Sequence, residues 1–213
     1  MVDQGQKGYC VVATAERVMR YYGIPVDEHE LAELANSSAS QGTSNAAMFD
    51  SLKKLAQRLR VRTRTIEDMD THQALDVIHT YNQLARRNHV AEIPDPSGPW
   101  SLGEIYGAMK PDLLKAARTR NKGDVTRFQQ LVQDNIDQGI PVLWTVILGI
   151  VHEDKAPQAI GGHMRLIIGY NATTNEILYS DSWGPGHELK RMPTPDAWTM
   201  TISLNTIEPL SAN

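Results

Sequence analysis

The chain is poor in cysteine, because Cys10 is the only one among its 213 residues. A single thiol cannot form a disulfide within the chain, so no disulfide framework holds the fold and cysteine pairing does not reveal the compartment. A chain of this length, with 41% hydrophobic residues, can bury a substantial core without cross-links. The one thiol is therefore free for chemistry.

Long apolar runs and an excess of either charge are also missing. The apolar stretch 141–151 is about half as long as a bilayer span, so we expect no membrane-spanning segment. The net charge of −4 points to neither nucleic acid nor an anionic membrane as a partner. No basic segment followed by an apolar one opens the chain. We expect a cytoplasmic location, or a secreted or periplasmic one if a leading segment was removed before Met1.

Apolar residues recur at helical spacing through most of the first two-thirds of the chain. Residues 61–66 instead alternate arginine with apolar residues or threonine, which predicts a short strand whose basic face is a solvated edge. The helical pattern predicts helices over residues 10–22, 27–35, 44–60, 68–88, 102–120 with an interruption at Pro111, and 124–138.

The last third reads as strands. Residues 142–148 form a near-continuous run of β-branched and aromatic side chains, which indicates a strand buried on both faces. Further strands are expected over residues 164–170, 176–179, 187–192 and 199–207. The predicted class is α+β, with a helical lobe over about 1–138 and a sheet lobe over about 139–213 in one domain spanning 1–213.

Cys10 follows a polar, glycine-containing stretch and stands at the start of the first predicted helix. The unpaired N–H groups and the positive end of the helix dipole favour an anion there, so the thiol should lose its proton more easily than in water. A thiolate is a strong nucleophile. The alternative is that Cys10 is a small buried hydrophobic residue, as lone cysteines commonly are.

Two later segments supply what a cysteine nucleophile requires. His163 opens a strand after two glycines and is the candidate base, while Asp181 ends the next strand and could orient its imidazole. Consecutive antiparallel strands bring such residues side by side. Trp183 could cover the bond between them. Each alternative is structural: His163 as a core histidine, Asp181 as a turn cap and Trp183 as core.

A nucleophile that attacks an acyl carbon also needs donors for the oxyanion. The side-chain amide of Gln4 is the candidate, together with the backbone N–H of Cys10, and Gln6 competes for the same role. The histidines other than His163 form no HExxH or Cys/His pattern, so we expect neither a metal nor a cofactor. Among them His187 lies nearest to the proposed site in sequence, but a surface role is expected for it.

Three motifs in this order resemble those of papain-like cysteine peptidases: Gln4-Gly5 and Cys10 opening a helix, Gly162-His163 opening a strand, and Asp181-Ser182-Trp183-Gly184 after the next strand. Within that group the chain is most similar to the C39-like peptidases of bacteria. The resemblance implies a papain-like fold with the active site in a cleft between the two lobes. Residues 67–123 have no recognised counterpart.

The resemblance also implies roles and a substrate class. Cys10 would be the nucleophile, His163 the general base and acid, Asp181 the orienting residue and Gln4 the oxyanion donor. The substrate would be a peptide or protein, cut through a covalent acyl-enzyme. Papain itself has asparagine where Asp181 stands, and it has a further cysteine before the nucleophile and a tryptophan after it that are missing here, which argues against a cathepsin-type enzyme.

Two other functions fit the same residues. A papain-fold binding module would keep the fold without turnover, and an amidase or acyltransferase would use the same triad on another acyl group. A Cys10→Ala variant that keeps full function would favour the binding module, whereas trapping of the acyl group by an amine would favour the acyltransferase. Nothing in the sequence identifies the substrate or the cleavage specificity.

Overall fold

The structure is a computed structural model that describes residues 10–26, 53, 54, 56, 58–96, 100–154 and 156–210. Within these residues lie six helices and one six-stranded antiparallel sheet. The helices are α1 (Cys10–Tyr21), α4 (Thr71–Arg87), α5 (Leu102–Ala108), α6 (Pro111–Arg118), α7 (Lys122–Asp137) and α8 (Thr194–Met200). The strands are β1 (Val61–Asp68), β2 (Val142–Leu148), β3 (Gly161–Asn171), β4 (Glu176–Ser180), β5 (Lys190–Pro193) and β6 (Thr201–Pro209).

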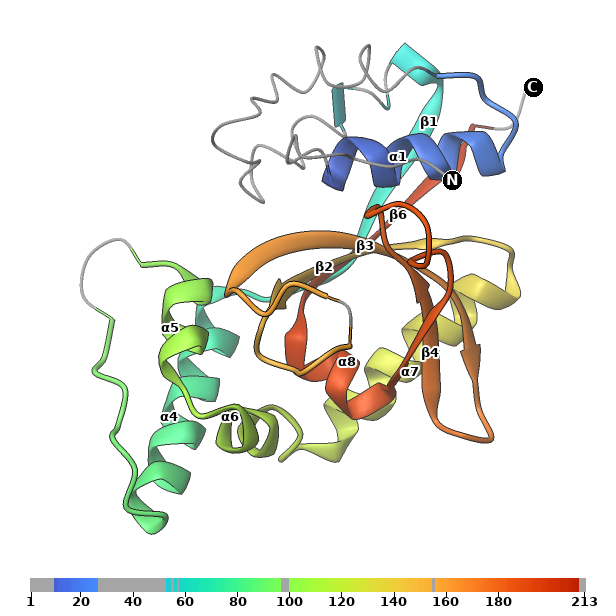
Figure 1. Ribbon diagram of the computed structural model, residues 1–213. Helices are drawn as coiled ribbons and strands as arrows, with labels where there is room; N and C mark the ends of the chain where they lie inside the picture. Colours follow the sequence, from blue (N-terminus) through green and yellow to red (C-terminus); the bar gives the residue numbers. More distant parts are fainter. Residues whose placement is uncertain are drawn as a thin grey trace.

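The α+β class is confirmed, and one sheet organises the whole chain (Figure 1). Its strand order is β1-β6-β2-β3-β4-β5, so β6 lies between β1 and β2. All seven residues of β2 are buried, as the apolar run predicted. Strand β1 is an edge strand whose Arg62 and Arg64 are exposed and pair with Glu208 of β6, as expected for a solvated basic edge.

Helix α1 covers one face of the sheet. Because side chains alternate between the two faces of a strand, Leu143, Met164 and Leu166 point to α1. There they join the apolar side of the helix, which includes Val18 and Met19. This small core fixes the position of the first residue of α1, Cys10, over β3.

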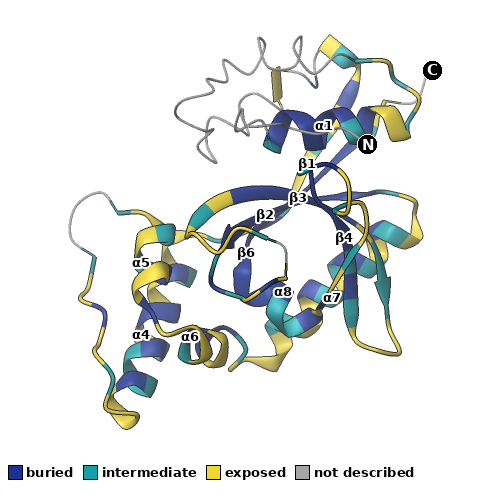
Figure 2. Cartoon of the chain, viewed as in Figure 1, coloured by how far each residue is buried: buried dark blue, intermediate teal, exposed yellow. Residues whose placement is uncertain are grey.

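The other face of the sheet carries the larger core. Trp144, Val146 and Ile167 belong to it, together with side chains from α4, α6, α7 and α8. Figure 2 shows the buried strands between α1 and these helices. Helices therefore lie on both faces, and β1 joins the sheet although it precedes residue 138. The division near residue 138 describes the order of elements along the chain rather than two separate layers.

Element boundaries differ from the sequence pattern in several places. Helix α4 begins at Thr71 because the Asp70 side chain accepts a hydrogen bond from the backbone N–H of Gln73, forming a capping box. The expected strand over 199–207 begins only at Thr201, because residues 194–200 form α8. Strand β5 starts at Lys190 rather than at residue 187. The helix expected over 27–35 lies outside the described residues, as does most of the one expected over 44–60.

Candidate active site

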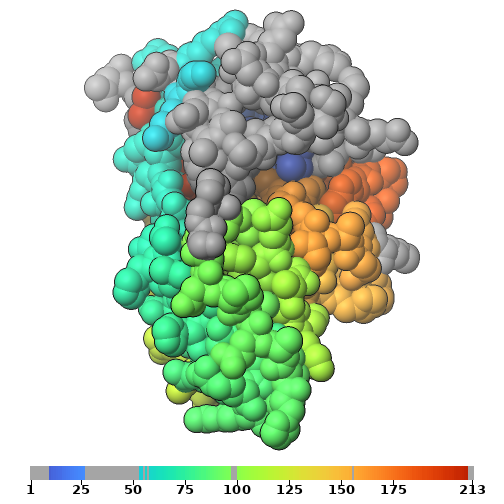
Figure 3. Space-filling model, turned by 90° about the vertical axis from the view of Figure 1, so that its left-hand side faces the viewer, coloured from blue at the N-terminus to red at the C-terminus, as the bar shows by residue number. Residues whose placement is uncertain are grey.

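Cys10 is the first residue of α1 and is partly exposed. The Thr14 hydroxyl, one turn later, donates a hydrogen bond of 2.6 Å to the Cys10 carbonyl oxygen. The same hydroxyl lies 3.4 Å from the carbonyl oxygen of Met164 in β3, which links the helix to the strand. In Figure 3 a small blue area, part of α1, reaches the surface beside orange residues of the C-terminal half. The thiol end of α1 thus lies next to the strand that carries His163.

His163 and Asp181 are brought together by the hairpin of β3 and β4. His163 is the third residue of β3, and Asp181 follows the last residue of β4. The two strands pair antiparallel, with Leu166 opposite Ser180. The Nε2 of His163 lies 2.6 Å from Oδ1 of Asp181, and the two side chains are 5% and 0% exposed. The expected adjacency of these two residues is therefore present in the structure.

The second ring nitrogen of His163 is left for Cys10, and the two side chains are hydrogen-bonded. Burial alone would raise the pKa of the Cys10 thiol, but the hydrogen bond to His163 and its positive charge lower it below its ordinary value. Burial would lower the pKa of His163, but its bonds to Asp181 and Cys10 raise the pKa to about 9. A thiolate and an imidazolium are therefore favoured together.

The carboxylate of Asp181 is held in its charged form. Burial would raise its pKa, but the hydrogen bond and charge of His163, followed by the charge of Arg165, keep the pKa below its usual range. The backbone N–H of Ser182 also donates to Oδ1 at 2.9 Å. The indole of Trp183 stacks on the His163 ring, with 4.3 Å between centroids and 10° between planes. Trp183 thus lies against the imidazole, as a cover for this bond requires.

Arg165 is a residue of this site that the sequence reasoning missed. It is fully buried, and its Nε donates a hydrogen bond of 2.8 Å to Oδ2 of Asp181. Its Nη1 donates at 2.8 Å to Oε1 of Glu153, whose other oxygen accepts a bond from the Tyr179 hydroxyl. The signal was present in the sequence, because Arg165 is a charged residue within an apolar strand, two positions from His163 and so on the same face.

Arg17 was missed as well. It lies two turns after Cys10 on the same helix, and its Nη1 donates a hydrogen bond of 3.3 Å to the carbonyl oxygen of Asp181. Its Nη2 donates to the Ser180 hydroxyl. Arg17 therefore connects the helix that carries the thiol to the end of the strand that precedes Asp181.

The remaining expectations have different outcomes. Gln4 and Gln6 lie outside the described residues, so the oxyanion donor stays a prediction. His187 is partly buried rather than at the surface, and its ring meets Trp183 edge to face with 5.6 Å between centroids. Within the described part of the chain no cluster of three or more His, Cys, Asp or Glu side chains could hold a metal ion. None of the described helices is both long and apolar enough to cross a membrane.

Chemically, this arrangement can generate a nucleophile and supply a proton. The imidazolium form of His163 can protonate a leaving group close to Cys10, and Asp181 fixes the orientation of the ring. Because the three side chains come from α1, β3 and the end of β4, packing of α1 on the sheet is what assembles them.

Comparison with known proteins gives a family match and similarity to solved structures. A model of the Peptidase C39 like family matches residues 1–204. Among solved structures, one match is the peptidase domain of Streptococcus ComA, described as a bifunctional ABC transporter involved in a quorum-sensing pathway. That match has 13% sequence identity and a TM-score of 0.48, and it covers 98% of this chain and 97% of the other. No curated protein matches the sequence significantly.

Proposed function

The chain belongs to the Peptidase C39 like family, and from that premise we propose that it is a cysteine peptidase whose nucleophile is Cys10. One observation carries the proposal: Cys10, His163 and Asp181 form a continuous hydrogen-bonded series in which the thiol pKa is lowered and the imidazole pKa is raised. That order of pKa values supports a thiolate–imidazolium pair at neutral pH.

The reaction begins when the Cys10 thiolate attacks the carbonyl carbon of the peptide bond. The carbonyl electrons move to its oxygen, which the Cys10 backbone N–H and the Gln4 amide would stabilise. As the carbon–nitrogen bond breaks, the His163 imidazolium donates its proton to the leaving amine. The products of this half-reaction are a free amine, a thioester on Cys10 and a neutral imidazole.

Water completes the turnover. Neutral His163 removes a proton from a water molecule, which attacks the thioester carbon, and the thiolate leaves as the carboxylic acid product forms. Asp181 keeps Nε2 protonated throughout, so Nδ1 exchanges the proton with substrate and water. We assign Arg165 a positioning role, because its bond to Oδ2 holds the carboxylate with Oδ1 facing His163.

Alkylation of the single thiol as a function of pH tests the nucleophile. Because Cys10 is the only cysteine, iodoacetamide labelling followed by mass spectrometry needs no site assignment. We expect fast labelling at pH 6, where a free thiol is almost fully protonated, and labelling at least about tenfold slower in His163→Ala at the same pH. Equal rates in the two proteins at pH 6 would refute the ion pair.

Hydrolysis of a peptide library gives the second readout. Peptide cleavage needs His163 protonated and Cys10 ionised, so activity should fall as pH rises through about 9, where His163 loses its proton, and should fall again at acidic pH below the lowered thiol pKa. Cys10→Ala should lose at least about a thousandfold in kcat. Unchanged cleavage by Cys10→Ala would exclude Cys10 as the nucleophile.

A further inference from the structure

A polar cavity lies away from Cys10, on the side of the sheet opposite to α1. Its volume is about 820 Å³, which is in the range of sites for small molecules and short peptides. Residues from α4, the end of α6, the start of α7 and the junction of α8 with β6 line it, and none of them belongs to the candidate active site. Most of its lining residues fall within residues 67–123.

The lining of this cavity combines buried apolar residues with polar and charged ones. Val77, Trp198 and Ile202 are at most 9% exposed and form part of the lining. Three arginines and three carboxylates also line it, so the numbers of arginines and carboxylates balance: Arg118, Arg120, Arg127, Glu67, Asp76 and Asp124. A cavity of this composition suits a ligand that carries both an apolar part and charges of both signs.

Most of these charges already have partners within the protein. Arg127 donates to both carboxylate oxygens of Glu67, and Arg120 donates to the amide oxygen of Gln83 at 2.8 Å. Asp76 faces His72 one turn away at 3.3 Å, where both side chains are highly exposed. Only Arg118 and Asp124 remain to be accounted for.

Arg118 is a buried cation that forms no direct ion pair with a described residue, although the charges of Glu67 and Asp124 act on it from nearby. It is 6% exposed, and its Nη2 donates hydrogen bonds to the carbonyl oxygens of Trp198 at 2.8 Å and Thr201 at 3.0 Å. Its guanidinium carbon lies 4.1 Å from the centroid of the Trp198 ring, and its Nε is buried without a hydrogen-bond partner. A buried charge without a direct ion pair is costly, so Arg118 would stabilise an anion bound in the cavity.

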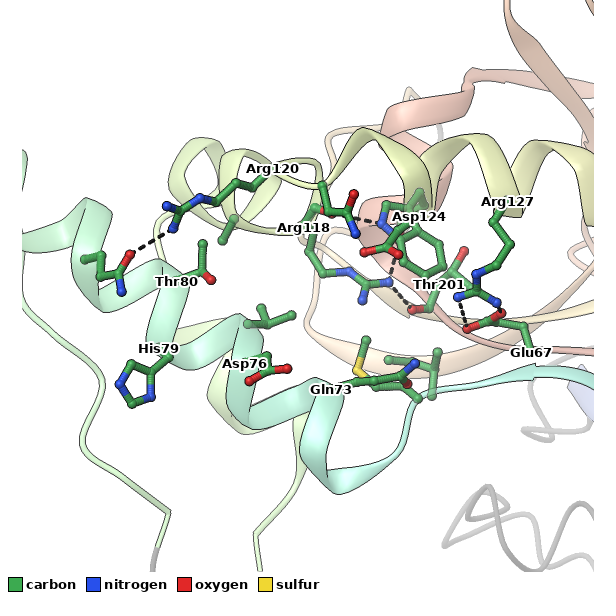
Figure 4. A pocket seen from close by; sticks show the side chains of 17 residues that line it. Glu67, Gln73, Asp76, His79, Thr80, Arg118, Arg120, Asp124, Arg127 and Thr201 are labelled. Atoms are coloured by element: carbon green, nitrogen blue, oxygen red, sulfur yellow. Dashed lines mark hydrogen bonds and ion pairs between the residues drawn. The ribbon is translucent and has the colours of Figure 1, made fainter.

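Asp124 is a carboxylate that could bind the cationic group of a ligand in the same cavity. It is half-buried in the first turn of α7 and, within the described part of the chain, forms no ion pair. Figure 4 shows Asp124 beside Arg118, with Asp76 on the facing helix α4. A cation and an anion thus line the same cavity without pairing with each other, beside the face of a buried tryptophan.

We propose that this cavity binds a zwitterion with an apolar side chain, either a free amino acid or a short peptide. Its carboxylate would meet Arg118, its ammonium group would meet Asp124 with Asp76 nearby, and its side chain would lie on Trp198. Because Nη2 of Arg118 already donates to two carbonyl oxygens and Nε is buried, the carboxylate would accept its hydrogen bond from Nη1. A phosphate would also suit Arg118, but it would leave Asp124 unused. The site is independent of Cys10 and of the proposed peptidase reaction.

Calorimetric titration of the full chain tests this site directly. Leucine and dileucine are the two probes, used with Cys10→Ala so that the dipeptide stays intact. Leucinamide lacks the carboxylate and N-acetyl-leucine lacks the ammonium group, so each should bind at least about tenfold more weakly than leucine. Tighter binding of leucine than of dileucine identifies a free amino acid as the ligand, and the reverse identifies a peptide.

Variants of the lining separate recognition from folding. Asp124→Asn should weaken the binding of leucine about tenfold. It should leave the binding of N-acetyl-leucine unchanged, because that ligand has no ammonium group to contact Asp124. Arg118→Lys should weaken the binding of leucine and leave the binding of leucinamide unchanged, because leucinamide has no carboxylate to contact Arg118. Asp134→Asn, on the exposed side of the same helix α7 and outside the cavity, is the matched control and should change neither.

Three results would overturn the proposal. The first is that neither leucine nor dileucine gives binding heat up to 10 mM. The second is equal affinity for leucine and leucinamide. The third is that Asp124→Asn weakens the binding of leucine and of N-acetyl-leucine equally. The first two are measured with the native lining, so they remain decisive if a lining variant fails to fold.

Discussion

The carboxylate of Asp181 is shared between two cations. His163 takes Oδ1 at 2.6 Å and Arg165 takes Oδ2 at 2.8 Å, while Glu153 balances the charge of Arg165 from its other side. Four buried charges of alternating sign therefore follow one another from His163 to Glu153. Such a series is tolerated in a low-dielectric interior only when each member has its partners, because an unpaired member is costly.

Removal of Arg165 should therefore affect both stability and chemistry. Arg165→Met leaves two buried carboxylates without their shared cation, so the free energy of unfolding should fall by about 3 to 5 kcal/mol. The unshared Asp181 charge then acts on His163 alone, which raises the pKa of His163 and moves the alkaline limit of activity to higher pH. We expect kcat to fall roughly 10-fold to 100-fold, as for the outer partners of metal-binding histidines.

Urea unfolding and the pH profile of peptide hydrolysis check this prediction. Adding Glu153→Gln to Arg165→Met removes one orphan carboxylate and should restore part of the stability without restoring the pH profile. Arg62→Met, at an exposed pair with Glu208, is the control and should change stability by less than about 1 kcal/mol. If the alkaline limit of activity has the same pH in Arg165→Met as in the unaltered protein, Arg165 has only a structural role.

Residue by residue, the sequence reveals the site only in part. The adjacency of His163 and Asp181 could be predicted, because each ends or opens a strand and consecutive antiparallel strands place such positions together. Arg165 could have been suspected as a charged residue within an apolar strand, but Glu153 could not be inferred, since it lies in the loop between β2 and β3 and its position depends on the tertiary fold. The catalytic roles themselves stay proposals.

At the scale of elements, the packing of α1 on the sheet determines whether Cys10 meets His163. The contact is mainly apolar and includes Val18, Met19, Leu143 and Met164. Arg17 and Thr14 add polar links to the strands. Since α1 makes no other large contact within the described residues, a defect in this interface should act on the helix and on the thiol together.

Truncation of Met19 tests that interface. Met19 is 1% exposed, so Met19→Ala leaves a cavity and should lower the free energy of unfolding by about 2 to 5 kcal/mol. Leu75→Ala on α4, at a position that is 40% exposed, is the matched control and should cost less than about 1 kcal/mol. Urea unfolding followed by circular dichroism measures both. Comparable losses in the two variants would contradict the assignment of Met19 to a buried interface.

Elements were predictable where one local pattern dominated. The continuous apolar run of β2 predicted a strand, the apolar spacing of α1 predicted a helix, and no other pattern in these two segments favoured a different structure. In α4 the short Ala74 and the β-branched Val77 are buried, whereas the larger Leu75 is exposed, so residue size alone does not identify the packing face. Helix α8 was missed because its end, Trp198 to Met200, contains residues that also suit a strand.

On the scale of the whole molecule, the sheet joins parts of the chain that are far apart in sequence. Strand β1 pairs with β6 across more than half of the chain, and α1 packs on strands from the last third. Neither a helical nor a sheet portion is complete without the other. We therefore propose that residues 1–213 form a single domain, in agreement with the family match over residues 1–204.

A single domain should unfold in one cooperative step. Circular dichroism at 222 nm follows the helices, fluorescence follows the four tryptophans, which include the buried Trp144 and Trp198, and reaction of Cys10 with a thiol reagent follows α1. We expect the three signals to give the same urea midpoint within experimental error. Exposure of Cys10 at a clearly lower urea concentration would instead identify α1 as a separately unfolding unit.

The position of β6 within the sheet bears on how this protein is made. Residues 201–209 insert between two strands that were synthesised earlier, so β1 has no sheet partner and β2 keeps an open edge until the ribosome has released that segment. A nascent chain therefore cannot close the scaffold beneath His163 before residues 201–209 have left the ribosome. Any proteolytic capacity would arise only after this late strand has docked between β1 and β2.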